Sequence, residues 1–327
     1  MTQEVRPTPS FSKFDYRVRP NKSTERKMLV DAFRRLSGFA PVEKYRYIGL
    51  GSTTFADFIL FHKALNISDM ISIEHRTEYE PRFEFNRPFE CIDIKYGDSN
   101  KILPELKWDK KTITWLDYDG ALTDAVLQDV AFLSAKCVSG SLMVITVNAS
   151  GYHQHPGQKY TKAEQGFKDK LGKQLAREVP SWATGINLQG DEMAKTYKRI
   201  IYDEVAARLR DRNGMAAPEE VIEFEPLINL VYRDGARMLT VGGIFFKHSE
   251  KDSFSKCQFA ALDFIGKELY EIQVPVITPR ERHYLNQHLP KGALDKITEA
   301  IGLTKEEIYN YARSYRYSPS YAEIELS

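Results

Sequence analysis

The chain has 327 residues, of which 42% are hydrophobic and 28% charged, and its formal net charge is +1. These values are typical of a soluble globular protein with one large domain or two, and they give no overall electrostatic footprint for nucleic acid. The three cysteines have no Cys-x-x-Cys spacing and suggest neither disulfides nor a thiolate metal site. No signal peptide and no apolar run of about 18 residues is present, so we expect a cytoplasmic protein without membrane contact.

Residues 1–42 are predicted to form an N-terminal leader followed by one helix. Apolar residues recur at helical spacing over residues 24–37. Basic side chains crowd the start of this helix, at Arg19, Lys22, Arg26 and Lys27. Two interpretations are open: a solvated basic face, or a group of which some members face a cleft and bind an anionic substrate or a cofactor carboxylate.

A strand over residues 45–48 opens into a glycine turn, and an apolar helix over residues 55–65 follows. Glycine at two positions of the turn would let the backbone approach a ligand closely. The helix N-terminus would offer unpaired N–H groups to an anion. The turn residues are therefore predicted to bind a cofactor: Gly49, Gly51, Ser52 and Thr53.

Two later strands end in acidic residues, one at Glu74 and the other at Asp117, with Gly97-Asp98-Ser99 between them. Open α/β sheets bind ligands at the carboxyl ends of their strands. Glu74 lies about 20 residues after the glycine turn, where a carboxylate can accept hydrogen bonds from both ribose hydroxyls. Asp98, with Ser99 beside it, has the chemistry to meet the exocyclic amine of an adenine. The pattern predicts a binding site for an adenosine-containing ligand, and Asp117 is expected to be one of the residues that line this site.

This order of motifs resembles the class I S-adenosylmethionine-dependent methyltransferases, especially the small-molecule O-methyltransferase branch. There, Gly-Asp followed by Leu-Pro precedes a strand ending in Asp, as Gly97-Asp98, Leu103-Pro104 and Asp117 do here. The whole chain also resembles a bacterial family of putative O-methyltransferases, on a block like Arg19–Met28. The resemblance implies S-adenosyl-L-methionine as the cofactor. It also implies a Rossmann-like α/β fold over residues 43–250, with a mostly parallel sheet and a closing antiparallel hairpin.

The chain departs from that pattern at two positions. Tyr47 stands where the methyltransferases carry an acid near the methionine amine of the cofactor, and Thr53 stands where they carry a third glycine. A second function therefore stays open. The protein would then be a catalytically altered Rossmann-like protein that binds a nucleotide-like ligand and acts through protein or nucleic-acid partners.

Beyond Asp117, a helix is predicted over residues 121–136 and a nearly continuous apolar strand over residues 141–147, which is typical of a strand buried on both faces. The strand ends at Asn148, and the loop that follows carries His153 and His155. This loop is expected to lie beside the loop after Asp117.

A charged helical insertion is predicted over about residues 160–215, with helices at 162–178 and 192–212, and we interpret it as a lid or a partner surface. Two apolar runs, residues 226–232 and 237–246, flank Arg233-Asp234-Gly235 and indicate a β-hairpin.

Residues 251–327 are predicted to form a C-terminal helical region. It includes a packing helix around residues 259–269 and a helix-turn-helix over residues 294–315. Tyrosines and arginines interleave over residues 309–317, a pattern that can serve nucleic-acid contact. A helical cap or an oligomer surface is favoured instead, so a homo-oligomer or a protein partner is open for this region and for the insertion.

Methyl transfer is an in-line displacement in which the acceptor atom must lose its proton. The residues predicted to take part in catalysis are Asp117, Asp119, His153 and His155. A divalent cation held by Asp117 and Asn148 is the alternative, but the second acid of metal-dependent O-methyltransferases is missing, and His-x-His lacks a third zinc ligand. Asp119 could also simply cap the following helix. The methyl acceptor is not indicated by the sequence.

Overall fold

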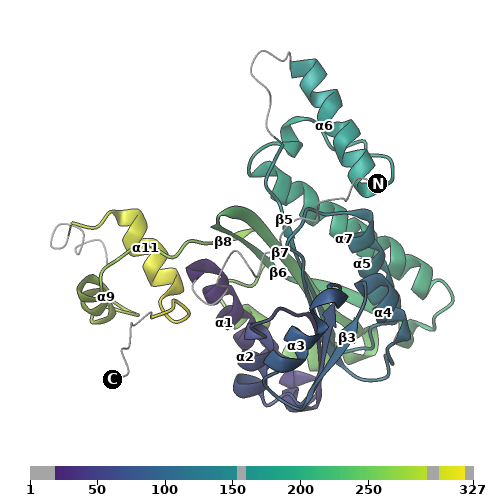
Figure 1. The fold of residues 1–327 in the computed structure, drawn as a ribbon, viewed down its shortest axis with the longest axis horizontal. Helices are drawn as coiled ribbons and strands as arrows, with labels where there is room; N and C mark the ends of the chain where they lie inside the picture. Colours follow the sequence, from purple (N-terminus) through teal and green to yellow (C-terminus); the bar gives the residue numbers. More distant parts are fainter. Residues whose placement is uncertain (1–18, 153–159, 293–301, 321–327) are drawn as a thin grey trace.

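The computed structural model describes residues 19–152, 160–292 and 302–320. Its centre is an eight-stranded sheet in the order β3-β2-β1-β4-β5-β7-β6-β8 (Figure 1). The first five strands are parallel, and β7 pairs antiparallel with both β5 and β6. The strands are β1 Arg46–Leu50, β2 Asp69–Glu74, β3 Ile92–Tyr96, β4 Thr112–Asp117, β5 Ser141–Asn148, β6 Ile222–Asp234, β7 Ala236–Lys247 and β8 Tyr270–Ile272. The expected mostly parallel α/β sheet with a closing antiparallel hairpin is confirmed.

Helices cover both faces of this sheet. The helices are α1 Pro20–Arg35, α2 Ala56–Leu65, α3 Glu80–Asn86, α4 Ser99–Glu105, α5 Asp124–Lys136, α6 Tyr160–Leu175, α7 Glu192–Asn213, α8 Lys251–Lys256, α9 Pro279–Asn286 and α11 Lys305–Ser314. Because side chains alternate along a strand, neighbours on β4 enter different cores. Trp115 packs in the core of α1 and α2, whereas Leu116 packs in the core of α5 and α7.

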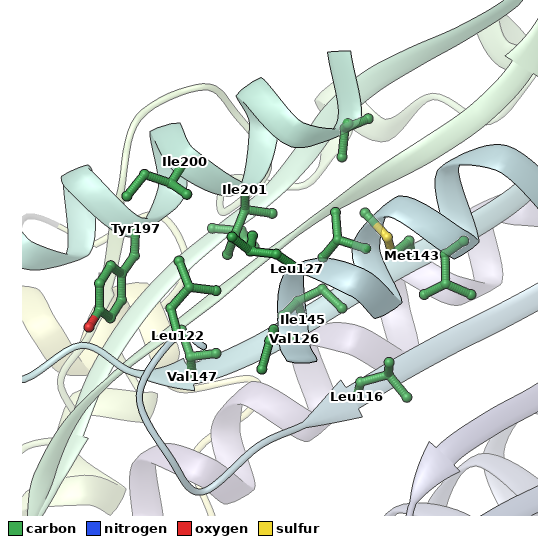
Figure 2. Packing of buried hydrophobic residues seen from close by; sticks show 14 of the residues in the cluster. Leu116, Leu122, Val126, Leu127, Met143, Ile145, Val147, Tyr197, Ile200 and Ile201 are labelled. Atoms are coloured by element: carbon green, nitrogen blue, oxygen red, sulfur yellow. The ribbon is translucent and has the colours of Figure 1, made fainter. Parts of the chain in front are cut away.

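Strand β5 lies in the middle of this arrangement and is buried over residues 141–147, as its apolar sequence predicts. Figure 2 shows Met143, Ile145 and Val147 in the core with Leu127 of α5 and Ile201 of α7. Each such side chain contributes roughly 1.5–3 kcal/mol when it is removed from water. This burial fixes β4 and β5 side by side and hence the position of the loop after Asp117.

The predicted insertion contains α6 and α7, and these two helices lie in different places. Helix α6 projects from the body of the molecule (Figure 1). Helix α7 instead packs against the sheet and α5, with Tyr197, Ile201 and Val205 almost fully buried. Interpreting the whole insertion as a lid is therefore wrong for α7, which belongs to the core.

The hairpin of β6 and β7 turns at Gly235, where φ is +111° and a side chain would be strained. Beyond it, the sequence did not predict β8, which pairs parallel with β6 at the edge of the sheet. The packing helix expected around residues 259–269 is also wrong. Only Phe259–Ala261 form a 3₁₀ turn, and Phe259, Leu262 and Phe264 are buried from an irregular segment, because tertiary packing outweighs helix propensity there.

The C-terminal helices α9 and α11 share a small separate core of Leu285, Ile308 and Tyr311. Helix α11 begins with a capping box between Thr304 and Glu307, and α9 begins with the same motif. The first helix of the predicted helix-turn-helix, residues 294–301, lies outside the described residues. In the described ranges, no helix is both long enough and apolar enough to cross a lipid bilayer.

Candidate active site

A cavity of about 720 Å³ opens at the carboxyl ends of β1, β2 and β4, the edge that the sequence predicts for a ligand. This volume lies within the range of about 300–1,000 Å³ that is typical of small-molecule sites. The structure brings most of the predicted site residues together in its wall: Gly51, Ser52, Glu74, Asp98, Ser99, Asp117 and Asp119.

Gly49 and Thr53 are not among the residues that line this cavity. A Cβ at position 49 would lie 2.6 Å from the hydroxyl oxygen of Tyr47, so glycine here makes room for the tyrosine. Tyr47 is itself a core residue, with its ring 5.0 Å from the rings of Phe58 and Phe61. The structure thus gives Gly49 a packing role, and the ligand contacts of Gly49 and Thr53 stay predictions. His153 and His155 lie outside the described residues.

Glu74 ends β2 with only 3% of its surface exposed, yet it lines the cavity. The Ser72 hydroxyl donates a hydrogen bond of 3.1 Å to its Oε1 atom. A Cβ at Gly51 would lie 1.8 Å from this same oxygen, so only glycine at position 51 permits this placement of the carboxyl group. Burial raises the pKa of Glu74 to about 8, against the opposing effect of the Ser72 hydrogen bond. A buried carboxylate of this kind is stabilised by hydroxyl donors from a ligand.

Asp98 and Ser99 lie at the start of α4 and differ in their surroundings. Asp98 is exposed and forms an ion pair of 2.8 Å with Lys101. Ser99 donates a hydrogen bond to Asp129, and the Tyr118 hydroxyl donates to the same oxygen at 2.5 Å. Burial raises the pKa of Asp129, although these two donors oppose the shift. The three side chains thereby connect the segments after β3 and β4, and Ser99 and Tyr118 are part of the cavity wall.

The first turn of α2 was expected to offer N–H groups to a ligand anion. Phe55 precedes this helix with φ of +47° and provides no side-chain cap. Asp57 lies in the first turn, where a negative charge is favoured by the helix dipole. Its carboxylate is hydrogen-bonded and ion-paired with Arg26 of α1. The anion nearest this helix start is therefore part of the protein itself.

Five charged side chains of α1, α2 and β4 form what we call the ion network: Lys22, Glu25, Arg26, Asp57 and Asp117. The Lys22 ammonium lies 2.8 Å from Glu25 Oε2 and 2.7 Å from Asp117 Oδ2, and Arg26 pairs with Asp57. Lys22 and Arg26 are buried, so the solvated-face interpretation is wrong for them, and Arg26 does line the cavity.

Burial and the neighbouring charges shift the pKa values of Asp117 and Lys22. Burial raises the pKa of Asp117 to about 6; the Lys22 ammonium opposes this shift, and the nearby carboxylates of Glu25 and Asp57 add to it. Burial lowers the pKa of Lys22, but Asp117 and Glu25 outweigh that effect and the net shift is upward. Glu25 and Asp57 were not predicted as site residues from the sequence. The sequence signal for Glu25 is its position three residues after Lys22, where the two side chains share one face of a helix. Nothing in the sequence singles out Asp57.

The described residues do not support the alternative of a bound divalent cation. Within residues 19–152, 160–292 and 302–320, no group of three or more His, Cys, Asp or Glu side chains could hold a metal ion. Asn148, its proposed second ligand, accepts a hydrogen bond of 3.0 Å from the Ser150 backbone N–H.

Solved structures with a similar arrangement include Trm1 from Pyrococcus horikoshii with S-adenosyl-L-methionine, at 10% identity and a TM-score of 0.47, covering 74% of this chain and 58% of Trm1. Human N-acetylserotonin methyltransferase with the same ligand matches at 13% identity and a TM-score of 0.33, over 73% of this chain and 59% of the enzyme. Precorrin-6y C5,15-methyltransferase from Geobacter metallireducens matches at 10% identity and a TM-score of 0.33, over 64% and 84%. This chain thus spans less than two thirds of the length of Trm1.

No curated protein matches the sequence. One family does match, over residues 14–326 and therefore over nearly the whole chain, and it is described as "Putative O-methyltransferase". The chain belongs to this family of putative O-methyltransferases.

Proposed function

We propose that this protein is an S-adenosyl-L-methionine-dependent methyltransferase that acts on an oxygen of its acceptor. One observation carries the proposal: the buried carboxyl group of Glu74 faces a cavity of about 720 Å³ at the end of β2, against a glycine that leaves it room. Membership of the putative O-methyltransferase family supports the reaction and its direction to oxygen.

The residues of the cavity fit an adenosine-containing cofactor. Glu74 provides two carboxylate oxygens for the two ribose hydroxyls, which would replace the water that burial has removed. Asp98 lies in the same wall, with its exposed carboxylate available to an adenine amine. We propose that residues 43–250 form this cofactor-binding part and that residues 251–327 are an appendage to it.

The cofactor supplies a methyl group on a sulfonium, which is activated for transfer. The chain then has to orient the acceptor and accept its proton. Asp117 ends β4, Asp119 lies two residues further along, and both line the cavity, so we propose them as the proton acceptors. Asp117 is ion-paired with Lys22, whereas Asp119 is exposed.

Calorimetric titration with S-adenosyl-L-methionine tests the cofactor, and transfer of a radiolabelled methyl group to hydroxylated small molecules tests the reaction. The proposal predicts saturable binding and label in an oxygen-methylated product. Absence of binding would remove the assignment, and label on nitrogen or carbon would remove the direction to oxygen.

A second function, ligand binding without catalysis, is favoured by one observation. Tyr47 is packed among aromatic rings where the resemblance leads one to expect an acid near the cofactor. Binding of S-adenosyl-L-methionine without any methyl transfer, across acceptors with hydroxyl, amine and thiol groups, would support this second function over the first.

A further inference from the structure

Four side chains on and just after α11 form what we call the α11 stripe: Lys305, Tyr309, Arg313 and Arg316. They recur at i, i+4, i+8 and i+11, which places them on one side of the helix. The opposite side, with Ile308 and Tyr311, packs in the small separate core. Lys305, Tyr309 and Arg316 are exposed, Tyr309 with 59% of its surface. The α11 stripe is therefore a surface of cations around an aromatic ring.

The cations of the α11 stripe have no ion-pair partner within residues 19–152, 160–292 and 302–320. Arginines on β1, α7 and β7, by contrast, pair with acids. Two acids of the C-terminal region, Glu281 and Glu307, are used by the capping boxes of their own helices. Asp263 acts on Arg316 from a distance but forms no ion pair with it. The positive charges of the stripe thus remain available to an anion from outside the protein.

Tyrosine rings hold the arginines of this surface in place. The Arg313 guanidinium lies 4.0 Å from the ring centre of Tyr270 and 5.3 Å from that of Tyr309. The Arg316 guanidinium lies 5.6 Å from the ring centre of Tyr315. A stacked guanidinium keeps its N–H donors for phosphate oxygens. Phosphate contacts combined with aromatic rings on which bases stack are typical of single-stranded nucleic-acid binding.

Helix α1 connects this surface with the cavity. Tyr317, which directly follows the stripe, donates a hydrogen bond of 3.0 Å to Asp31 of α1. One turn earlier on α1, burial and the charge of Arg282 on α9 lower the pKa of Lys27, so these two cations lie near each other. The neighbour of Lys27 in the chain, Arg26, lines the cavity. Figure 1 shows α1 between α11 and α2. A strand on the stripe can thus reach the cavity by crossing α1.

We propose that the α11 stripe binds single-stranded RNA and that RNA is the acceptor class of the enzyme. This inference rests on the proposed function, because the oxygen acceptor within an RNA strand is the ribose 2′-hydroxyl, which DNA lacks. The hydroxyl oxygen forms a bond to the methyl carbon while the bond between this carbon and sulfur breaks. The hydroxyl proton passes to a carboxylate of the cavity, Asp117 or Asp119, and S-adenosylhomocysteine leaves.

The first test measures binding of a fluorescent single-stranded RNA of about 20 nucleotides by anisotropy at several salt concentrations. The affinity of the wild type should fall steeply with salt, because phosphate contacts release counterions. The double variant Lys305→Gln, Arg316→Gln should make the slope of log affinity against log salt shallower by about 1.4, which is about 0.7 for each lost contact with a single strand. Tyr309→Ala should weaken binding about fivefold or more, and Tyr309→Phe should restore it, because a base stacks on either ring.

The matched control is the double variant Lys136→Gln, Arg210→Gln. It removes the same charge from exposed positions on α5 and α7, whose core lies on the other face of the sheet from α1. The control should keep the salt slope of the wild type. Both double variants should bind S-adenosylhomocysteine like the wild type in calorimetry, since none of the four residues lines the cavity.

The second test uses the same RNA as the acceptor, with S-adenosyl-L-methionine carrying a radiolabelled methyl group. A methyl group on the 2′-oxygen blocks alkaline cleavage at the next phosphodiester, so the label should be recovered in alkali-resistant dinucleotides. Single-stranded DNA of the same sequence should bind but accept no label.

Failure of the wild type to bind RNA would overturn the inference, and so would a salt slope that the stripe variant leaves unchanged or that the control reduces equally. Binding to phosphatidylserine vesicles instead of RNA would overturn it as well and assign the stripe to an anionic lipid surface. RNA that binds at the stripe but stays unlabelled would overturn RNA as the acceptor. In each of these cases, binding of S-adenosylhomocysteine would leave the proposed function standing, whereas its absence would remove that function whatever the RNA result.

Discussion

Glu74→Gln changes one buried acid to a neutral group of the same size and therefore isolates the effect of its charge. A glutamate carboxyl group in water has an ordinary pKa of 4.5, whereas in the folded protein burial raises the pKa of Glu74 to about 8. Between these two values the folded state keeps a proton that the unfolded state has lost. The stability of the ligand-free wild type should therefore fall as the pH rises from 4.5 to 8.

The magnitude follows from this difference of about 3.5 pH units. At about 1.36 kcal/mol per unit, the upper limit is about 5 kcal/mol. Glutamine cannot ionise, so the variant should escape this cost. Relative to the wild type, we expect Glu74→Gln to gain about 2–4 kcal/mol in free energy of unfolding between about pH 5 and about pH 8.5.

Urea unfolding at these two pH values measures the gain. Glu105→Gln on α4 is the control, since the side chain of Glu105 is exposed in the folded protein and its substitution should show no such pH dependence. A difference between wild type and Glu74→Gln that stays constant over this pH range would refute the claim that Glu74 is buried without a compensating charge.

Three further substitutions test other parts of the site. Gly51→Ala places a Cβ 1.8 Å from Glu74 Oε1 and 2.1 Å from Ser72 Oγ, so it should cost about 1–3 kcal/mol of stability and weaken cofactor binding; an unchanged melting temperature and affinity by calorimetry would contradict this. Lys22→Met leaves Glu25 and Asp117 without their shared cation. It should lower the free energy of unfolding by roughly 3–5 kcal/mol at neutral pH, and by less at about pH 5. A loss below about 1 kcal/mol in urea unfolding would exclude this role of Lys22. Asp119→Asn should lower kcat by about 100-fold or more at saturating cofactor while leaving cofactor affinity unchanged; steady-state kinetics with full activity would remove Asp119 from the proton transfer.

The sequence predicted the parts of the fold that depend on local patterns. Apolar runs that stop at Glu74 and Asp117 became β2 and β4, and the Arg233-Asp234-Gly235 turn became the hairpin of β6 and β7. These elements bring the carboxyl ends of their strands to one edge, which is why most of the predicted site residues line one cavity.

What the sequence could not predict depends on contacts between distant segments. Lys22 is charged and lies at the start of a helix, which locally favours exposure. Lys22 can be buried because its ammonium group pairs with Asp117, a residue far away in the chain. The role of Gly49 could not be predicted either. Only the structure shows that the absence of a side chain at this position makes room for Tyr47. The sequence of β8 is too short to carry a strand pattern, and only its pairing with β6 shows that it is a strand.

The central claim is that Glu74 holds the ribose of an adenosine cofactor in this cavity, and a crystal structure of the protein with S-adenosylhomocysteine tests it most directly. We predict density for the nucleoside between Gly51 and Asp98, with both ribose hydroxyls about 2.5–3.0 Å from the carboxylate oxygens of Glu74. Density for the ligand at another surface, or a ribose that leaves Glu74 without contact, would contradict the account.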